Sequence, residues 1–295
     1  LAPCALLSPS FTQHSGLPAR ICYAIKGNPR RGILRLLQRR GAWIDAVSPC
    51  EVETARKAGF AAERILFTGT SVGRADLRAV FAVDGLTVNI DAAEQLDVMS
   101  EVKRREFPDK TIRVSVRWNA GIGRGFNARV ITAGKRSSDG TPIKFGVEEK
   151  KVVGVFSRAK KLGFKPVGLH QHLGSGWVRE DFGMVRTAVD RLVRKAREIE
   201  RAGFPLEFVD FGGGFGPRYL RGRGVFPVED YIAYIADAVA RAGLGVKALA
   251  IEPGKYLVGD AGVLLLGVEY VKESYGNIFA CVDGGTFNTV PRPAI

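Results

Sequence analysis

The stretch Tyr23–Pro29 reads YAIKGNP, and it decides how the rest of the chain is interpreted. The apolar, β-branched and aromatic run that ends at Ile25 is typical of a buried strand, and Gly-Asn-Pro then breaks it. Lys26 is therefore expected at the carboxyl end of a core strand, where α/β folds keep their active sites. Burial would lower the pKa of its amine and make it a nucleophile that can form a Schiff base. A lysine that only extends from the strand end into water is the alternative.

Strand-like and helix-like segments alternate from this stretch onward. Because a helix pattern follows nearly every strand pattern, the βα count predicts an α/β fold, a TIM (β/α)8 barrel. Strands are expected at residues 21–25, 43–47, 65–69, 87–90, 112–118, 168–173, 208–211 and 248–252. Helices are expected at residues 31–40, 48–58, 74–82, 92–105, 148–162, 180–202 and 228–242, with Asp91 as the cap of the fourth.

The chain is expected to have three parts. Residues 1–20 form a shortened N-terminal segment with one strand of a β domain, and residues 11–19 leave too little chain for a helix before the first barrel strand. Residues 21–258 form the barrel. Residues 259–295 lose the βα alternation and are strand-like at 261–272 and 278–283, which predicts the beginning of a C-terminal β domain that this chain does not complete.

The composition is typical of a soluble globular protein, with 46% hydrophobic and 25% charged residues. The longest apolar run, at residues 262–268, is too short to cross a bilayer, so no membrane role is expected. The net charge of +14 is spread along helices such as residues 186–201, where acidic residues alternate with basic ones. Solvated helix faces explain this pattern better than a nucleic-acid site does.

The cysteines and the start of the chain indicate the compartment. Cys4, Cys22, Cys50 and Cys281 are scattered without a CxxC pair. Cys22 and Cys281 lie in apolar runs, which predicts buried thiols in a reducing compartment. The first residues show no basic region typical of a signal peptide, so a cytoplasmic location is expected.

Polar residues recur where the predicted strands end. Because function in a barrel collects at the carboxyl ends of the strands, we expect these residues to form one site. They are Lys26, Asp45, Arg117, His170, His172, Gly212–Gly214 and Glu252.

The glycine run Gly212-Gly213-Gly214 follows the seventh strand. Glycines let backbone N–H groups approach an anion closely, and loops after the last barrel strands often bind phosphate. A tight turn that needs positive φ is the alternative. Ser175, between two glycines after the sixth strand, offers a hydroxyl and further amides to the same phosphate.

His170 and His172 are expected on one face of the sixth strand, because side chains alternate along a strand. They could be core histidines, two metal ligands, or one histidine stacked on a flat cofactor. A metal site would need Asp45, Asp210 or Glu252 to complete it. Glu252 could stabilise a protonated heterocyclic nitrogen or form an ion pair, and Lys255 could contact a phosphate or a substrate carboxylate.

Several motifs resemble one known family. YAIKGNP is similar to the Tyr-Ala-x-Lys-Ala-Asn-Pro motif of fold-type III enzymes that use pyridoxal 5'-phosphate (PLP). GLHQHLGSG resembles their His-x-His-x-Gly-Ser motif, DFGGGFG their glycine loop, and EPGK their Glu-Pro-Gly-Arg. KFG at residues 144–146 and DGG with RPA near the C-terminus also match. Together, over residues 22–295, these motifs resemble the PLP-dependent decarboxylases, and among them the diaminopimelate decarboxylases, which have an alanine racemase-like barrel.

The resemblance implies a role for each matching residue. Lys26 would hold PLP as a Schiff base, His172 would stack on the pyridine face, and Glu252 would pair with the ring nitrogen. These three would be catalytic. The phosphate would contact Gly212, Gly213, Gly214 and Ser175, and the Schiff base would lie near Asp45, Glu51 and Arg117. Pro253, Gly254 and Lys255 would also contact the cofactor. Lys255 and Arg292 would face the substrate carboxylate. No metal is implied.

The implied reaction is decarboxylation of meso-2,6-diaminopimelate to L-lysine and CO₂, in lysine biosynthesis. PLP stabilises the carbanion that remains when CO₂ leaves, and a carboxylate beside its ring nitrogen keeps that sink strong. Related racemases have an arginine at the position of Glu252, which favours a decarboxylase. Ornithine, carboxynorspermidine or a carrier-bound amino acid as substrate, and a non-catalytic PLP-binding relative, remain alternatives. A metal-dependent hydrolase that uses His170 and His172 is a third.

The chain also departs from the family pattern. Lys255 stands where the family has an arginine, which keeps the charge but loses the bidentate fork. The family's Cys-Glu-x-x-Asp segment and a later tyrosine do not occur up to Ile295. The resemblance implies a homodimer whose active site lies at the interface and takes that cysteine from the partner. A fragment or a degenerate relative is therefore expected.

Overall fold

The computed structural model describes residues 11–217 and 224–284. The chain divides into two compact units, Leu1–Asp260 and Ala261–Ile295, and each is described by itself.

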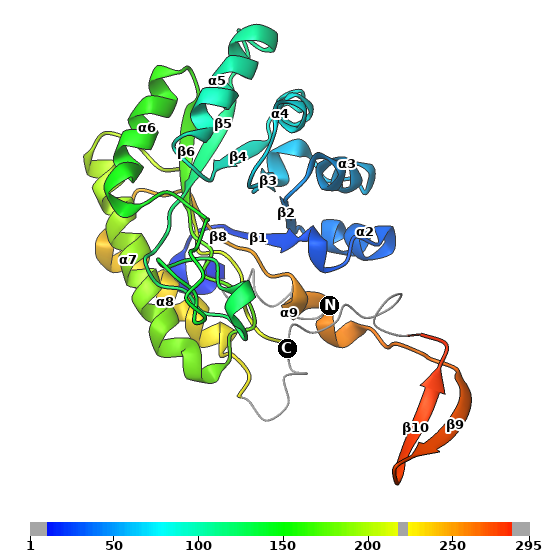
Figure 1. The fold of residues 1–295 in the computed structure, drawn as a ribbon. Coiled ribbons are helices and arrows are strands. Elements are labelled where there is room, and N and C mark those ends of the chain that lie inside the picture. The colour runs from blue at the N-terminus through cyan, green and yellow to red at the C-terminus, as the bar shows by residue number, and fades with distance from the viewer. Residues whose placement is uncertain (1–10, 218–223, 285–295) are drawn as a thin grey trace. The chain divides into compact units, whose positions relative to one another are not determined.

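The first unit contains a closed barrel of parallel strands, as predicted (Figure 1). The strands follow one another around the barrel in chain order, and pairing of β1 with β8, including Ile21 with Ile251, closes it. The eight strands are β1 Ala19–Ala24, β2 Trp43–Ala46, β3 Ile65–Phe67, β4 Thr87–Ile90, β5 Arg113–Arg117, β6 Lys165–His170, β7 Phe208–Asp210 and β8 Ala248–Ile251.

Helices follow the strands and lie outside the barrel (Figure 1). Their apolar faces and the outward faces of the strands form one continuous core. The α-helices are α2 Arg31–Arg39, α3 Pro49–Lys57, α4 Arg74–Phe81, α5 Gln95–Glu106, α6 Val152–Lys161, α7 Phe182–Arg201, α8 Val228–Ala242 and α9 Lys255–Val258. The 3₁₀ turns are η1 Ile25–Gly27, η2 Ala62–Arg64, η3 Ala128–Val130, η4 Glu149–Lys151, η5 Arg179–Asp181 and η6 Gly259–Ala261.

A second, smaller apolar cluster includes Cys22, Leu66 and Phe208 together with Ala248 and Ala250 of β8. The ring of Phe208 fills space that a side chain at Gly168 would need, since a Cβ there would lie 2.5 Å from it. Because side chains alternate along a strand, the next residues on the same faces are Asp210 after Phe208 and Glu252 after Ala250. An apolar layer in these strands therefore gives way to buried carboxylates at their carboxyl ends.

Three details differ from the expectations. Helix α5 begins at Gln95, and Asp91 does not cap it: its carboxylate accepts from Thr70 Oγ1 at 2.5 Å and from the Gly146 backbone N at 3.1 Å. Strand β6 ends at His170, so His172 lies in the following loop. Residues 11–15 are helical, where we expected no helix, and Phe11 buries its side chain in the core.

The second unit contains an antiparallel hairpin of β9 Val268–Ser274 and β10 Asn277–Val282. Tyr275 and Gly276, both with positive φ, make the tight turn that hairpins of this length prefer. Cys281 on β10 is only partly buried, unlike Cys22 in the barrel. Among the described residues, the structure contains no helix with the length and apolar character needed to span a membrane.

Candidate active site

Lys26 lies in η1, directly after β1, and forms an ion pair with Asp45 of β2. Lys26 Nζ is 3.1 Å from Asp45 Oδ2, because β1 and β2 pair with Ala24 opposite Asp45. The Asp45 side chain is 3% exposed, whereas that of Lys26 is 54% exposed. The charge of Asp45 raises the pKa of Lys26 above its ordinary value and outweighs the opposite effect of burial. The expectation of a lysine pKa lowered by burial was therefore wrong for this state of the protein.

Glu252 follows β8 and is buried between two histidines. Its Oε2 lies 3.1 Å from His170 Nε2 and 3.4 Å from His172 Nδ1. Burial alone would raise the pKa of Glu252, but its histidine neighbours, above all His170 through its charge and hydrogen bond, outweigh burial and hold this pKa well below its usual range. Its second oxygen, Oε1, has no hydrogen-bond partner among the described residues. The site thus presents an ionised carboxylate with one oxygen available.

His172 lies beyond the end of β6 with its side chain 22% exposed. The Gly213 backbone N lies 3.3 Å from His172 Nδ1 and donates to it. Burial lowers the pKa of His172, and this favours the neutral imidazole that can accept such a bond. A neutral, partly open ring held by the glycine loop is suited to stacking on a flat ligand.

The glycine loop after β7 packs too closely for larger residues. A Cβ on Gly213 would lie 1.9 Å from the Glu252 carbonyl oxygen, and Gly212 and Gly214 have φ values of +71° and +122°. The Gly214 carbonyl accepts from the Gly176 and Trp177 backbone N–H groups at 2.8 Å. The loops that carry Gly212–Gly214 and Ser175 therefore meet, as a shared phosphate site would require.

Arg117 is the last residue of β5 and is 6% exposed. Its Nη1 lies 3.5 Å from Asp91 Oδ1, and its guanidinium lies 4.7 Å from the centroid of the Phe145 ring. Burial lowers the pKa of Arg117, an effect that the Asp91 carboxylate opposes. Sequence reasoning missed Asp91 because it was interpreted as a helix cap. Its position as a carboxylate at the end of β4 was the signal that could have identified it.

The segment after β8 lies against the end of β1. The Pro253 carbonyl accepts from the Ala24 backbone N at 3.2 Å, and a Cβ on Gly254 would lie 3.1 Å from Ala24 Cβ. Lys255 begins α9, with Nζ 5.1 Å from the centroid of the Phe126 ring. Burial and, to a lesser degree, the charge of Lys26 lower the pKa of Lys255. Arg292 lies outside the described residues.

One group of buried residues could bind a metal ion by geometry. Potential ligand atoms of His170, Asp210 and Glu252 lie within 4.8 Å of one another. Burial and the charge of Glu252 raise the pKa of Asp210 well above its usual range, which favours the neutral form of this carboxyl group. A neutral carboxyl is a poor ligand for a cation, and His172, which the metal hypothesis needed, is not in the group.

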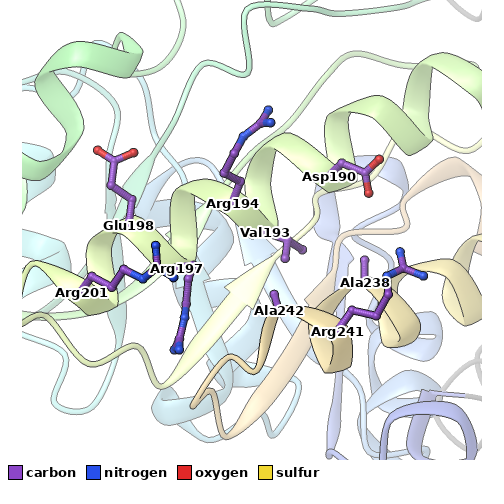
Figure 2. Close-up of a pocket in the computed structure, with 9 residues that line it drawn as sticks. All are labelled: Asp190, Val193, Arg194, Arg197, Glu198, Arg201, Ala238, Arg241 and Ala242. Atoms are coloured by element: carbon purple, nitrogen blue, oxygen red, sulfur yellow. The ribbon is translucent and has the colours of Figure 1, made fainter.

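Two cavities of the described residues lie away from Lys26 and Glu252. A groove of about 710 Å³ lies between α7 and α8, and Figure 2 shows side chains that line it, including Arg194, Arg197, Arg201 and Arg241. Its lining comes from the two outer helices and not from strand ends. A cavity of about 820 Å³ is lined by parts of residues 92–94, 119–121, 134–135 and 143–151, including Lys144 and Gly146. Neither lining includes Lys26 or Glu252.

The strand ends fit a phosphorylated pyridine aldehyde better than a metal ion. Lys26 offers an accessible amine, and His172 offers a partly open ring. Glu252 has an unpartnered, buried oxygen for a protonated ring nitrogen, and the glycine loop meets the loop that follows Ser175, where a phosphate would bind. Each of these features matches one part of such a molecule.

Comparisons with known proteins agree with this fit and confirm the resemblance. The family description "Pyridoxal-dependent decarboxylase, pyridoxal binding domain" matches residues 9–259. The chain is 39% identical over 282 residues to diaminopimelate decarboxylase of Methanothermobacter thermautotrophicus, and 31% identical over 281 residues to that of Aquifex aeolicus. These alignments cover 94% of this chain but only 62% and 63% of the relatives, so the chain spans a little under two thirds of their length.

A solved structure is similar over almost the whole chain. Diaminopimelate decarboxylase from Helicobacter pylori, complexed with L-lysine, superposes with a TM-score of 0.85 at 28% identity. The match covers 97% of this chain and 69% of that one. The chain therefore belongs to the pyridoxal-dependent decarboxylases and contains their pyridoxal binding domain.

Proposed function

We propose that the protein to which this chain belongs decarboxylates meso-2,6-diaminopimelate to L-lysine and CO₂. The observation that carries the proposal is that Lys26, which is accessible, and Glu252, which is ionised and has one unpartnered oxygen, lie at the same end of the barrel. The chain that holds them is similar to diaminopimelate decarboxylases over 94% of its length. The L-lysine in the related Helicobacter pylori structure supports the choice of substrate.

Different residues of this chain would bind different parts of the cofactor. Lys26 would bind the aldehyde carbon, His172 would stack on the pyridine ring, and Glu252 would accept a hydrogen bond from its nitrogen. Gly212–Gly214 and Ser175 would bind the phosphate, with Lys255, Pro253 and Gly254 beside it. Bound pyridoxal phosphate supplies an electron sink that stabilises the negative charge left when CO₂ departs.

Three charged residues of the chain would orient or polarise the groups that bind the cofactor. Asp45 holds Lys26 protonated and oriented at the end of β1. Glu252 stays ionised at neutral pH, so it favours a proton on the ring nitrogen. Arg117, held by Asp91 and stacked on Phe145, places a buried positive charge among these acids. Arg292, outside the described residues, would face the substrate carboxylate together with Lys255.

We also propose a homodimer in the cytoplasm. The hairpin unit carries exposed apolar side chains, including Tyr270, Val271 and Ile278, and such surfaces commonly mark a protein contact. The free cysteines Cys22, Cys50 and Cys281 are consistent with a reducing compartment. Light scattering of the full protein should give twice the subunit mass, and a monomer that remains fully active would contradict the dimer.

The decisive experiment measures CO₂ release by the full protein from a panel of diamino acids. Release from meso-diaminopimelate, at least about 100-fold faster per enzyme than from ornithine, lysine or arginine, supports the proposal. Lys26→Ala should abolish both the release and the covalent capture of PLP on borohydride reduction. PLP capture without CO₂ release from any amino acid would instead indicate a non-catalytic relative, and the absence of PLP binding would refute the function.

A further inference from the structure

His170 is a fully buried histidine for which the function above leaves no role. It is the last residue of β6, its side chain is 0% exposed, and its Nε2 lies 3.1 Å from Glu252 Oε2. An ionised carboxylate can only accept hydrogen bonds, so the nitrogen that faces Glu252 must carry the hydrogen. His170 therefore donates to Glu252, whichever charge state its ring has.

His172 does not duplicate this bond. Its Nδ1 lies 3.4 Å from the same Glu252 oxygen, but the Gly213 N–H also donates to Nδ1. One ring nitrogen cannot accept from Gly213 and donate to Glu252 at once. The two histidines thus have different tasks: the glycine loop holds His172, whereas His170 holds Glu252.

We propose that His170 is a positioning residue, whose Nε2 fixes Glu252 Oε2 so that the unpartnered Oε1 is presented to the ring nitrogen of PLP. The inference rests on the proposed function, because it assigns Glu252 to that nitrogen. A carboxylate free to rotate would offer either oxygen in many orientations, and a buried donor on one oxygen removes that freedom.

The other groups around Glu252 fit this arrangement. Asp210 is opposite His170 in the pairing of β6 with β7, and its raised pKa favours the neutral carboxyl, which adds no second negative charge beside Glu252. Among the described residues, the remaining groups whose charges interact with Glu252 are Lys26, Arg117, His172 and the thiol of Cys22. Of these, Lys26 and Arg117 have carboxylate partners of their own, Asp45 and Asp91.

The test compares three replacements of His170 in the full protein. Leu removes the donor at similar volume, Gln offers an amide N–H at about the reach of Nε2, and Asn offers one that stops short of it. The exposed histidine His14 provides the control, His14→Leu. For each variant we would measure the dissociation constant for PLP and the absorbance of the bound cofactor as a function of pH.

His170→Leu and His170→Asn should weaken PLP binding by about tenfold, as expected for the loss of one hydrogen bond to a charged group, whereas His170→Gln should stay within about threefold of wild type. The pH at which the bound cofactor loses its ring proton should fall in Leu and Asn but not in Gln, because a misplaced carboxylate stabilises that proton less. His14→Leu should match wild type in both measurements.

Other outcomes would overturn the inference. Wild-type affinity and an unchanged pH profile in His170→Leu would show that the bond is dispensable. An equal loss in Gln, Asn and Leu would show that the ring only fills space, and the Gln–Asn comparison decides this even if Leu does not fold. Zinc bound at one equivalent and lost in these variants would make His170 a metal ligand instead. In each of these cases the wild-type protein still binds PLP, so the proposed function stands. If the wild-type protein did not bind PLP, the proposed function would be refuted as well.

Discussion

Asp210 and Glu252, two buried acids at the carboxyl ends of neighbouring strands, have pKa values shifted in opposite directions. Burial and the charge of Glu252 raise the pKa of Asp210, whereas the charge and hydrogen bond of His170 do most to hold the pKa of Glu252 well below its usual range. Two ionised carboxylates in one buried cluster would repel each other, so these opposite shifts favour a single negative charge on the pair. The imidazoles place that charge on Glu252, which is the acid with the free oxygen.

Asp210→Asn should make the PLP-free protein more stable at neutral pH. The folded protein keeps a proton on Asp210 that the unfolded chain releases near the ordinary pKa of 3.8. The stability from this proton is complete below that pH and is lost as the pH rises toward the raised folded pKa. Asn cannot ionise, so its advantage over wild type should grow above about pH 4 and level off once Asp210 is ionised in the folded state.

Urea unfolding of both proteins at pH values from 4 to 9 would measure this difference. Asp139→Asn serves as the control, because Asp139 is an exposed acid whose pKa is lowered to about 2 by hydrogen bonds from Ser137 and Thr141. It should not become more stable than wild type as the pH rises. A constant difference between Asp210→Asn and wild type at every pH would contradict a neutral Asp210.

Gly213→Ala should destabilise the protein by about 3 kcal/mol, the upper range for overpacking a rigid site. The new Cβ would lie 1.9 Å from the Glu252 carbonyl oxygen, and a backbone atom cannot move aside as a side chain can. Gly154→Ala in α6 is the matched control, because its Cβ would meet nothing within 4 Å. That change should stabilise the helix by about 0.5–1 kcal/mol, and equal unfolding midpoints for the two variants would refute the argument.

The barrel could be predicted from the sequence, because its evidence is local. Apolar runs alternate with amphipathic helices, and eight such strands close a parallel barrel. The inward direction of Glu252 follows from the same pattern, since it continues the face of Ala248 and Ala250. That Glu252 lies near the polar residues at the ends of the other strands is also predictable, because the parallel strands of a barrel all end at one edge.

The details of the site depended on contacts that the sequence does not record. The pKa of Lys26 is governed by Asp45, a residue on another strand, and not by burial of its own strand end. Asp91 resembled a helix cap, yet tertiary contacts with Thr70 and Gly146 use its carboxylate. His172 was assigned to β6, which ends two residues earlier, because a strand pattern does not mark where a loop toward Gly213 begins.

Asp45→Asn should lower the pKa of Lys26 toward the ordinary value of 10.5 in the PLP-free protein. The charge of Asp45 is the main cause of the raised pKa, and a neutral amide no longer stabilises the ammonium group. More of the amine is then neutral at pH 9, so an acylating reagent should label Lys26 several-fold faster. Mass spectrometry of the peptide that contains Lys26, over a range of pH, measures the midpoint of labelling.

The control for this change is Asp84→Asn. Asp84 pairs with Lys110 at 2.7 Å but is 91% exposed, so its loss should leave the labelling of Lys26 unchanged. An unchanged midpoint in Asp45→Asn would mean that the ion pair does not govern the reactivity of Lys26. Faster labelling in both variants would indicate a general effect of net charge and not the contact at 3.1 Å.

Lys255→Met should weaken PLP binding by about tenfold, the cost of one charged hydrogen bond to a phosphate. Burial and the charge of Lys26 lower the pKa of Lys255 below its ordinary value. Lys255 is the first residue of α9, which follows β8, and its Nζ lies 5.1 Å from the centroid of the Phe126 ring. Lys255→Arg should keep the affinity, since arginine retains the charge and adds a bidentate fork. Lys247→Met, at the opposite end of β8, should bind PLP like wild type.

Titration of PLP absorbance gives the dissociation constant, and the KM for the amino acid separates the two roles open to Lys255. A contact with the phosphate predicts that Lys255→Met changes the dissociation constant of PLP more than the KM. A contact with the substrate carboxylate predicts the reverse, a raised KM at saturating PLP. Because burial lowers the pKa of Lys255, the PLP affinity of wild type should also fall at high pH as Lys255 loses its proton, and this decline should be absent from Lys255→Arg.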